Sequence, residues 1–262
     1  MMPMITRRLA ATIAATTLGF IFLPPQAVAA GGNTPVRVLV SNGIKAAMEE
    51  LQPQCERAIG HPLAVQFNST SSVKKMIEAG QGFDVTLITT EAIDDLIKQG
   101  KLAGSTRTPL ARSELGIGIR AGAAKPDIHS PEALKRSLRE AKSITFPQDG
   151  ASRGYIEKMF ERLGIAADVK SKIILAKGSG PATQSVADGK AAMVITLFSE
   201  IVPIHGVEIL GPLPGEYQSD IRFSAAASST ANDAAAAKAL ITFLAGPKVA
   251  PILKAKGLDP AH

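Results

Sequence analysis

The stretch VRVLVSNGI (36–44) decides the fold of this chain. Its first five residues are almost all apolar, and a short apolar run is typical of a buried strand. The run ends in the polar turn Ser41-Asn42-Gly43, after which apolar residues recur at helical spacing from 44 to 59. The stretch therefore predicts one unit of strand, polar turn and helix.

Two further units of the same kind follow directly along the chain. They comprise a strand at 63–67 with the turn NSTSS (68–72) and a helix at 73–79, then a strand at 84–88 with the turn TTE (89–91) and a helix at 92–99. Three such units in succession predict an α/β fold with a parallel sheet.

The rest of the chain continues to alternate strands and helices, and a late strand is followed by two closing helices. Strands are predicted at 115–120, 143–146, 172–176, 192–197, 207–210 and 222–228, and helices at 131–141, 155–163, 183–188, 233–244 and 250–256. This pattern predicts two lobes, each a mixed sheet flanked by helices, that are hinged by crossing strands. We expect residues 35–112 plus 225–262 in the first lobe and 113–224 in the second. A single open sheet of ten strands is the alternative.

The N-terminal segment has the order of features of a secretory signal peptide. Arg7 and Arg8 precede the apolar run 9–23, and the small residues of Ala27-Val28-Ala29 form a cleavage site. The apolar run is short for a membrane anchor, which needs about 20 residues. We therefore expect residues 1–29 to be removed near Ala30 after export to the periplasm, by the general secretory or the twin-arginine route, without later membrane insertion.

Composition and charge exclude several classes of function. The formal net charge is +6, and loss of the signal segment removes only Arg7 and Arg8, which leaves a mild +4. No basic run with interleaved aromatic residues is present, which argues against nucleic-acid binding. The chain has no Trp and only 4% aromatic residues, which argues against a sugar-binding cleft.

The few cysteines and histidines argue against a disulfide or a metal site. Cys55 is the only cysteine, so it has no internal disulfide partner, and its place in a helix predicts a small buried residue. The four histidines are scattered, and none has a partner at metal-ligand spacing. We expect no metal, no organic cofactor and a monomeric protein.

Hydroxyl-bearing residues and glycine gather where the predicted strands end and helices begin. In open α/β sheets, ligands bind at the carboxyl ends of strands, and helix N-termini attract anions through unpaired N–H groups. Each such residue alone is more often a helix cap, although one group can cap a helix and face a cleft. The predicted substrate-binding residues are Ser41, Asn42, Gly43, Ser69, Thr70, Ser71, Thr89, Ser152 and Ser179.

These turns, together with FDVTLIT (83–89), PQDGASRGYIEKMFERLG (147–164) and LAGPKVAPILKAKG (244–257), resemble the periplasmic molybdate-binding protein family over nearly the whole mature length. The resemblance implies a two-lobed periplasmic binding protein fold of type II. In that family an oxyanion is held by hydroxyls and backbone amides from both lobes. By position, Ser41 and Ser69 match the two family serines, and Ser152 and Ser179 fall where the second lobe supplies its contacts.

The sequence also departs from that family in the predicted cleft. Leu197 stands where the molybdate binders carry a tyrosine, and Arg153 is inserted into a second-lobe contact turn. A guanidinium binds planar carboxylates in a bidentate manner, so we expect a cleft suited to an organic acid, with Arg153 as a catalytic residue on one carboxylate. Its replacement by alanine should then weaken binding by about 2–5 kcal/mol if the pair is buried. The alternative for Arg153 is a solvated surface arginine.

Within this family, the length, the signal peptide and the SNGIK, NSTSS and DGASRG turns are similar to members that isomerise aconitate. The similarity implies cofactor-independent interconversion of trans- and cis-aconitate, a tricarboxylate, by an allylic proton transfer. The sequence does not single out the base, for which Lys45, Glu91, Asp149, Lys177 and His205 lie near the cleft turns. The alternatives are a substrate-binding receptor of an ABC transporter, for molybdate-like oxyanions or small organic acids, and a non-catalytic sensor domain.

Overall fold

The opening stretch forms the predicted strand at the centre of a parallel group of three. In the computed structural model, which describes residues 34–261, β1 (Val36–Ser41) lies between β2 and β3 and runs parallel to both. The polar turn after β1 forms a short 3-10 helix, η1, and leads into α1. The predicted signal peptide (1–29) lies outside the described residues.

The order of elements agrees with the strand and helix alternation predicted from the sequence. The strands are β1 (Val36–Ser41), β2 (Leu63–Asn68), β3 (Val85–Thr89), β4 (Thr108–Arg120), β5 (Ile144–Pro147), β6 (Ile173–Ala176), β7 (Met193–Leu197), β8 (Val207–Pro212), β9 (Asp220–Ala227) and β10 (Asp259–Pro260). The α-helices are α1 (Lys45–Ile59), α2 (Thr70–Glu78), α3 (Thr90–Lys98), α4 (Pro131–Glu140), α5 (Arg153–Arg162), α6 (Ala166–Lys170), α7 (Ser179–Ala187), α8 (Phe198–Ile201), α9 (Ala234–Leu244) and α10 (Ala250–Ala255). Four 3-10 helices, η1 (Asn42–Ile44), η2 (Gly104–Thr106), η3 (Gly215–Tyr217) and η4 (Pro247–Val249), complete the order.

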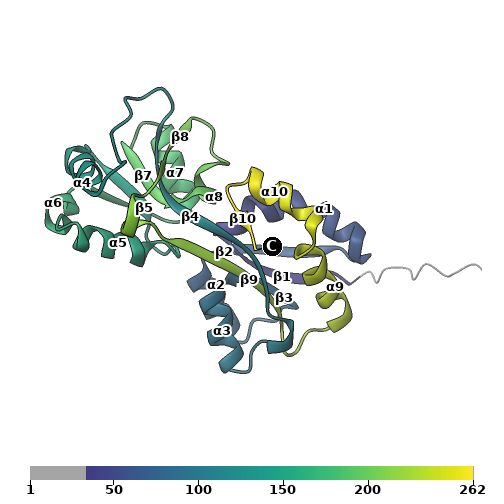
Figure 1. Ribbon diagram of the computed structural model, residues 1–262. Helices are drawn as coiled ribbons and strands as arrows, with labels where there is room; N and C mark the ends of the chain where they lie inside the picture. Colours follow the sequence, from purple (N-terminus) through teal and green to yellow (C-terminus); the bar gives the residue numbers. More distant parts are fainter. Residues whose placement is uncertain (1–33, 262) are drawn as a thin grey trace, which may run out of the picture. The chain divides into compact units, whose positions relative to one another are not determined.

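Two long antiparallel strands, β4 and β9, join the halves of the fold (Figure 1). The strand order is β2-β1-β3-β9-β4-β7-β5-β6, and β8 and β10 also pair with β4. The first part of β4 pairs with β9 and β10, and its last part pairs with β7 and β8. Hydrogen bonding thus runs through ten strands, while helices gather around two ends. The two-lobed binding-protein fold class is confirmed, and the lobe boundaries stay a prediction.

The strand β4 is much longer than the predicted 115–120. It begins at Thr108 and has 13 residues. Its first part carries Arg112 and Glu114, which conceal the apolar pattern of a buried strand, and its register shifts between Pro109 and Ala111. A proline lacks the N–H for a regular ladder, and strands accommodate it at such irregularities. The helices α6 and α8 were not predicted, because five and four residues are too few to display a helical period.

The apolar core runs through both groups of helices. The largest cluster extends from Val36 on β1 to Leu258 near the C-terminus, and it includes residues of β4, β5 and β9. Cys55 lies in this cluster on α1, fully buried, as the sequence predicts. Burial raises the pKa of its thiol to about 12, so the thiolate that reacts with oxidants and electrophiles is disfavoured.

An ion pair between a buried carboxylate and a half-exposed guanidinium ties the start of β3 to β1. Arg37 Nε and Nη2 donate to the two carboxylate oxygens of Asp84 at 3.0 and 2.9 Å. The backbone N–H groups of Arg37 and Asn232 also donate to this carboxylate, at 2.9 and 2.8 Å. Burial alone would raise the pKa of Asp84, but these hydrogen bonds and the guanidinium charge hold it below its ordinary value. The pair therefore fixes three segments of the first half.

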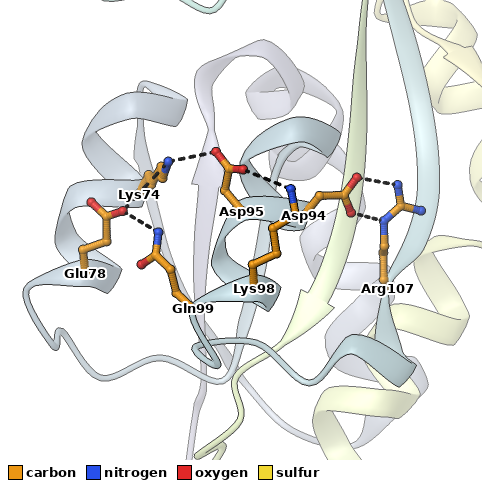
Figure 2. Close-up of polar contacts among 7 residues, drawn as sticks. All are labelled: Lys74, Glu78, Asp94, Asp95, Lys98, Gln99 and Arg107. Atoms are coloured by element: carbon orange, nitrogen blue, oxygen red, sulfur yellow. Dashed lines mark hydrogen bonds and ion pairs between the residues drawn. The ribbon is translucent and has the colours of Figure 1, made fainter.

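Exposed polar contacts connect α2, α3 and the segment before β4 (Figure 2). Lys74 on α2 lies 3.1 Å from Asp95 on α3, and Arg107 donates to Asp94 of the same helix. The side chains of these pairs are 29–50% exposed. Solvent and salt weaken such pairs, so each contributes little to stability compared with the apolar core.

The described residues contain no single helix that is long and apolar enough to span a membrane. The pair Ala234–Leu244 and Pro247–Ala255 meets the length and composition criteria together, with a bend of 55° between the helices. Buried residues of both helices, including Leu240 and Leu253, belong to the core cluster.

Candidate functional site

The hydroxyl groups of two predicted turns meet where β1 and β2 end. Ser41 Oγ accepts hydrogen bonds from the Thr70 hydroxyl at 3.0 Å and from the Gly43 N–H at 3.4 Å. Ser69 Oγ accepts from the Ser72 N–H at 3.2 Å and so caps α2. The turns adjoin because β1 and β2 are parallel and pair Ser41 with Asn68 in register. Ser69 therefore caps α2 beside the hydroxyl of Ser41.

Residues of the second half close over these hydroxyls and form a small pocket, which we call the hydroxyl pocket. Its volume is about 10 Å³, which is room for about one water molecule. Ser71 Oγ reaches the carbonyl oxygen of Asp149 at 3.4 Å and so joins the two halves beside it. The pocket is lined by Ser41, Asn42, Gly43, Ser69, Thr70, Pro147, Asp149, Gly150, Ala151, Gly178, Ser179, Leu197 and Glu200.

Gly43 is required in the hydroxyl pocket for steric reasons. A Cβ atom at this position would lie 2.4 Å from Phe223 on β9 and 3.2 Å from Leu197 on β7. Both side chains are about 1% exposed, so neither can turn out to solvent. The backbone at Gly43 therefore approaches Phe223 and Leu197 too closely for a larger residue.

A second, larger space adjoins the hydroxyl pocket, and we call it the larger cavity. Its volume is about 410 Å³. It shares Asn42, Gly178, Ser179 and Glu200 with the hydroxyl pocket. Its full lining is Asn42, Lys45, Ala46, Glu49, Lys177, Gly178, Ser179, Gly180, Pro181, Ser199, Glu200, Pro203 and Ile204.

The carboxyl group of Glu200 stands at the boundary of the two spaces. Thr196 Oγ1 at the end of β7 donates to its Oε2. Burial raises the pKa of Glu200, although hydrogen bonds from Thr196 and Ser179 act in the opposite direction, and the nearby charge of Asp149 raises it further. Among residues 34–261, no Lys, Arg or His nitrogen lies within 4 Å of this carboxyl group in an ion pair. The carboxyl group of Glu200 thus has a raised pKa and no ion-pair partner within 4 Å among the described residues.

The short helix α8 (Phe198–Ile201), which carries Glu200, is held by residues distant in sequence. The hydroxyl of Ser113 on β4 accepts from the Ser199 N–H at 3.1 Å and donates to the Gly257 carbonyl at 2.9 Å. Gly257 has a positive φ of 73°, and a Cβ atom there would lie 2.9 Å from the backbone of Phe198. The C-terminal segment and β4 therefore position the helix that presents Glu200.

Six of the predicted substrate-binding residues line the hydroxyl pocket, and the remainder fall elsewhere. The six are Ser41, Asn42, Gly43, Ser69, Thr70 and Ser179. Ser71 contacts Asp149 at the edge of the pocket. The linings of the hydroxyl pocket and the larger cavity do not include Thr89, Ser152 or Arg153.

The three residues outside the linings have other surroundings. Thr89 is buried at the end of β3, where it pairs with Phe223 of β9. Ser152 is 1% exposed, and among the described residues its Oγ has no hydrogen-bond partner. Arg153 was expected to hold a substrate carboxylate, but its Nε donates to Glu157 at 2.8 Å and its Nη1 donates to the Gln148 carbonyl at 2.6 Å. Its position resembles the alternative considered above, a surface arginine.

Glu200 is not among the candidate bases predicted from the sequence. Of the five predicted candidates, Lys45, Asp149 and Lys177 line the two spaces, whereas Glu91 and His205 do not. The available signal was an acidic residue shortly after a predicted strand, at 192–197. That signal is weak, because acidic residues are common at helix starts. Only the packing around α8 shows that this carboxyl is enclosed.

In the described part of the chain, acidic, histidine and cysteine side chains do not group into a metal site. Within residues 34–261, no three His, Cys, Asp or Glu side chains are grouped so that they could hold a metal ion. The groups that the site offers to a ligand are hydroxyls, amides, two lysines and carboxyls.

Comparisons with known proteins identify the family of the chain. A family model described as bacterial extracellular solute-binding protein matches residues 36–259. Aconitate isomerase of a Pseudomonas species is 29% identical over 87% of this chain and 88% of its own length. The molybdate-binding protein ModA of Azotobacter vinelandii is 27% identical over 85% of this chain and 88% of its own length.

A solved structure extends the likeness to three dimensions. The sulfate-binding protein SubI from Mycobacterium tuberculosis H37Rv superposes with a TM-score of 0.71 at 16% identity, and the match covers 87% of this chain and 88% of that chain. At this identity the likeness concerns the fold. The family match over nearly all described residues establishes that the chain belongs to the bacterial extracellular solute-binding proteins.

Proposed function

We propose that this protein is an isomerase that interconverts trans- and cis-aconitate in the space between the two halves of the fold. The observation that carries the proposal is the larger cavity beside the hydroxyl pocket, with an enclosed carboxyl group at their boundary. The similarity to aconitate isomerase of a Pseudomonas species supports the same reaction.

The sizes of the two spaces favour an organic acid over a bare oxyanion. Sites for small organic ligands have volumes of about 300–1,000 Å³, and the larger cavity, at about 410 Å³, falls in this range. The hydroxyl pocket, at about 10 Å³, has room for one atom of a ligand, such as a carboxylate oxygen. We infer that one carboxylate reaches toward Ser41 and Ser69 while the carbon skeleton occupies the larger cavity.

Charge around the larger cavity also suits a polycarboxylate. Lys45 and Lys177 line it, and Lys45 lies 3.6 Å from Glu49 on the same helix. Within the described residues, Lys177 has no carboxylate partner within 4 Å. Its ammonium group is therefore available to a ligand carboxylate, where an ion pair would also stabilise charge that develops during the reaction.

The reaction is an allylic proton shift, and the chain can assist it without an electron acceptor. A proton leaves one carbon and returns to a carbon two positions away, while the double bond moves between them. The negative charge of the intermediate spreads onto the terminal carboxylates. Hydroxyl and ammonium donors fixed around those carboxylates stabilise that charge. Enclosure between the two halves limits water and fixes the orientation of the substrate.

A direct assay tests the proposal. The mature protein is incubated with trans-aconitate, and cis-aconitate is followed by chromatography. We expect formation of cis-aconitate until a fixed ratio of isomers is reached, and approach to the same ratio from cis-aconitate. Heat-denatured protein is the control. Tight molybdate binding in calorimetry, with no conversion in either direction, would contradict the proposal.

A receptor for an ABC transporter is the second candidate function, and the similarity to ModA of Azotobacter vinelandii favours it. In that case the ligand would be a molybdate-like oxyanion or a small organic acid. The small volume of the hydroxyl pocket, about 10 Å³, weighs against a whole oxyanion at this place. The assay above separates the two candidates.

The place of action follows from the family and from the N-terminal segment. Extracellular solute-binding proteins act outside the cytoplasm, and the expected signal peptide (1–29) would bring the chain to the periplasm. We propose that the mature protein works there as a monomer on a small tricarboxylate anion, with lobes formed by 35–112 plus 225–262 and by 113–224.

A further inference from the structure

We propose that Glu200 is the catalytic residue that carries the proton between the two substrate carbons, first as base and then as acid. This inference rests on the proposed isomerase function and assigns the proton transfer to one side chain. The first ground is location, because Glu200 lines both the hydroxyl pocket and the larger cavity. A substrate that spans both spaces would place its carbon skeleton beside this carboxyl group.

The surroundings of Glu200 fix its orientation without neutralising it. Thr196 Oγ1 donates to Oε2, and Ser179 at the start of α7 is a second hydrogen-bonding neighbour. The Glu200 carbonyl accepts from the Thr183 hydroxyl at 3.1 Å, which fixes the backbone of α8. A base must keep its position while its protonation state changes, and hydroxyl groups suit this need because they can donate or accept.

The proton affinity of the group suits this task. Burial raises the pKa of Glu200 above the ordinary range of a glutamate, against the effect of the hydrogen bonds from Thr196 and Ser179. A general base is most effective when its pKa lies near the working pH. The charged groups that face it from other elements are Asp149 before α5, Lys177 before α7, and Lys45 and Glu49 on α1.

The proposed step conserves atoms and electrons. The Glu200 carboxylate takes a proton from the methylene carbon, and the electron pair of that C–H bond forms a new double bond to the central carbon. The electrons of the original double bond move onto the vinyl carbon and its carboxylate. The neutral Glu200 acid then returns the proton to that carbon. No oxidant or reductant is needed, and Glu200 ends in its initial state.

A neighbouring hydroxyl gives independent support for a polar ligand at this place. Ser199 lines the larger cavity, is 4% exposed, and its Oγ has no hydrogen-bond partner among the described residues. Buried hydroxyl groups are nearly always paired in folded proteins, so an unpaired one beside a cavity indicates a missing partner. A substrate carboxylate oxygen in the larger cavity would supply it.

The test is the variant Glu200→Gln, which keeps the shape of the side chain and removes its capacity to carry a proton. We expect it to bind trans-aconitate in calorimetry within about threefold of the wild type and to lose turnover by about 10²- to 10⁴-fold, the usual contribution of a general acid–base. In D₂O, wild-type protein should carry part of the substrate's own hydrogen to the new position, with deuterium entering as the Glu200 proton exchanges with solvent, and Glu200→Gln should do neither. The wild-type rate should also fall as the pH drops through the raised pKa of Glu200.

Two further variants make the outcome decisive. Glu161→Gln removes an exposed carboxylate from α5 outside both spaces and should leave turnover and exchange unchanged. Glu200→Asp should recover part of the turnover, because it retains a carboxyl group. Wild-type turnover that persists in a folded, ligand-binding Glu200→Gln would overturn the role of Glu200 alone. Ligand binding without turnover in the wild type would overturn the isomerase function and, with it, this role.

Discussion

Two carboxyl groups, the buried Asp84 in the first half of the fold and the half-buried Glu200 in the second, have opposite surroundings. Asp84 receives two hydrogen bonds from the Arg37 side chain, and backbone N–H groups complete its shell. Glu200 has neighbouring hydroxyls and no cation within 4 Å among the described residues. The pKa of Asp84 lies below its ordinary value, and that of Glu200 lies above.

The contrast shows that enclosure alone does not decide what a carboxyl group does. A carboxylate neutralised by a guanidinium is fixed in one charge state and serves the fold. One that faces a cavity and has no ion-pair partner within 4 Å can gain or lose a proton more readily, which is the property that proton transfer needs. Three substitutions test how far this distinction holds.

The largest effect is expected for Asp84→Ala. Its side chain is 3% exposed, and its loss leaves several donors and the Arg37 charge without a partner. We expect the free energy of unfolding to fall by about 1–3 kcal/mol, the usual cost of leaving buried hydrogen-bonding groups without a partner, because the half-exposed Arg37 can still be solvated. Urea denaturation followed by circular dichroism would measure this. The exposed Asp95→Asn is the control and should change stability by less than about 0.5 kcal/mol.

The contribution of Asp84 should also depend on pH with a definite sign. Because its pKa is lower in the folded protein, the unfolded chain binds more protons in acid, and stability falls as pH decreases. The contribution is complete above the pKa of an unfolded aspartate, about 3.9, and is lost through the lower folded value. A stability difference between wild type and Asp84→Ala that stays constant into strong acid would contradict this account.

A smaller effect of the opposite sign is expected for Glu200→Gln. Because the pKa of Glu200 is raised in the folded protein, the folded chain binds more protons, and stability falls as pH increases. The variant lacks this loss, so its stability should rise relative to the wild type as the pH increases above the unfolded glutamate pKa of about 4.3. Thermal unfolding from pH 4 to 8 would measure the gain. A constant difference across this range would place Glu200 in an ordinary, solvated environment.

The smallest effect is expected for Arg153→Ala, which breaks an exposed pair. Arg153 and Glu157 lie four residues apart on α5, with side chains 40% and 47% exposed. Such pairs contribute about 0.3–0.5 kcal/mol, so stability should hardly change. Because Arg153 lies outside both cavity linings, we also expect affinity for trans-aconitate to change by less than about threefold. A loss of about 2–5 kcal/mol in calorimetry would restore the carboxylate-binding role expected from the sequence.

Most of the fold could be predicted from the sequence because its signals are local. An apolar run followed by a polar turn and a helical period, as at VRVLVSNGI (36–44), specifies a unit by itself. The long strand β4 escaped prediction, since Arg112 and Glu114 interrupt its apolar pattern. The first part of β4 is nevertheless a strand, because its backbone pairs with β9 on one edge and with β10 on the other. A local sequence pattern does not reveal this pairing.

The serines that the first half of the fold contributes to the candidate site follow from the sequence more directly than the residues of the second half. Ser41 and Ser69 stand at the ends of adjacent parallel strands, so topology alone brings them together. Arg153 was expected at the substrate because of its chemistry, yet its side chain turns along α5 to Glu157. Glu200 was overlooked, because its enclosure depends on Thr196, Ser179 and the turn before α5, which lie on separate elements. The side-chain conformation of Arg153 and the burial of Glu200 depend on tertiary packing, which a local sequence pattern does not show.

The contact of Gly257 with α8 has a consequence for trimming of the chain at its C-terminal end. Through the Ser113 hydroxyl and the backbone of Phe198, Gly257 helps to position the helix that carries Glu200. A chain cleaved before residue 257 would keep Ser41 and Ser69 but lose this support for the acid. Proteolysis at this end of the molecule should therefore impair turnover while the hydroxyl groups are still in place.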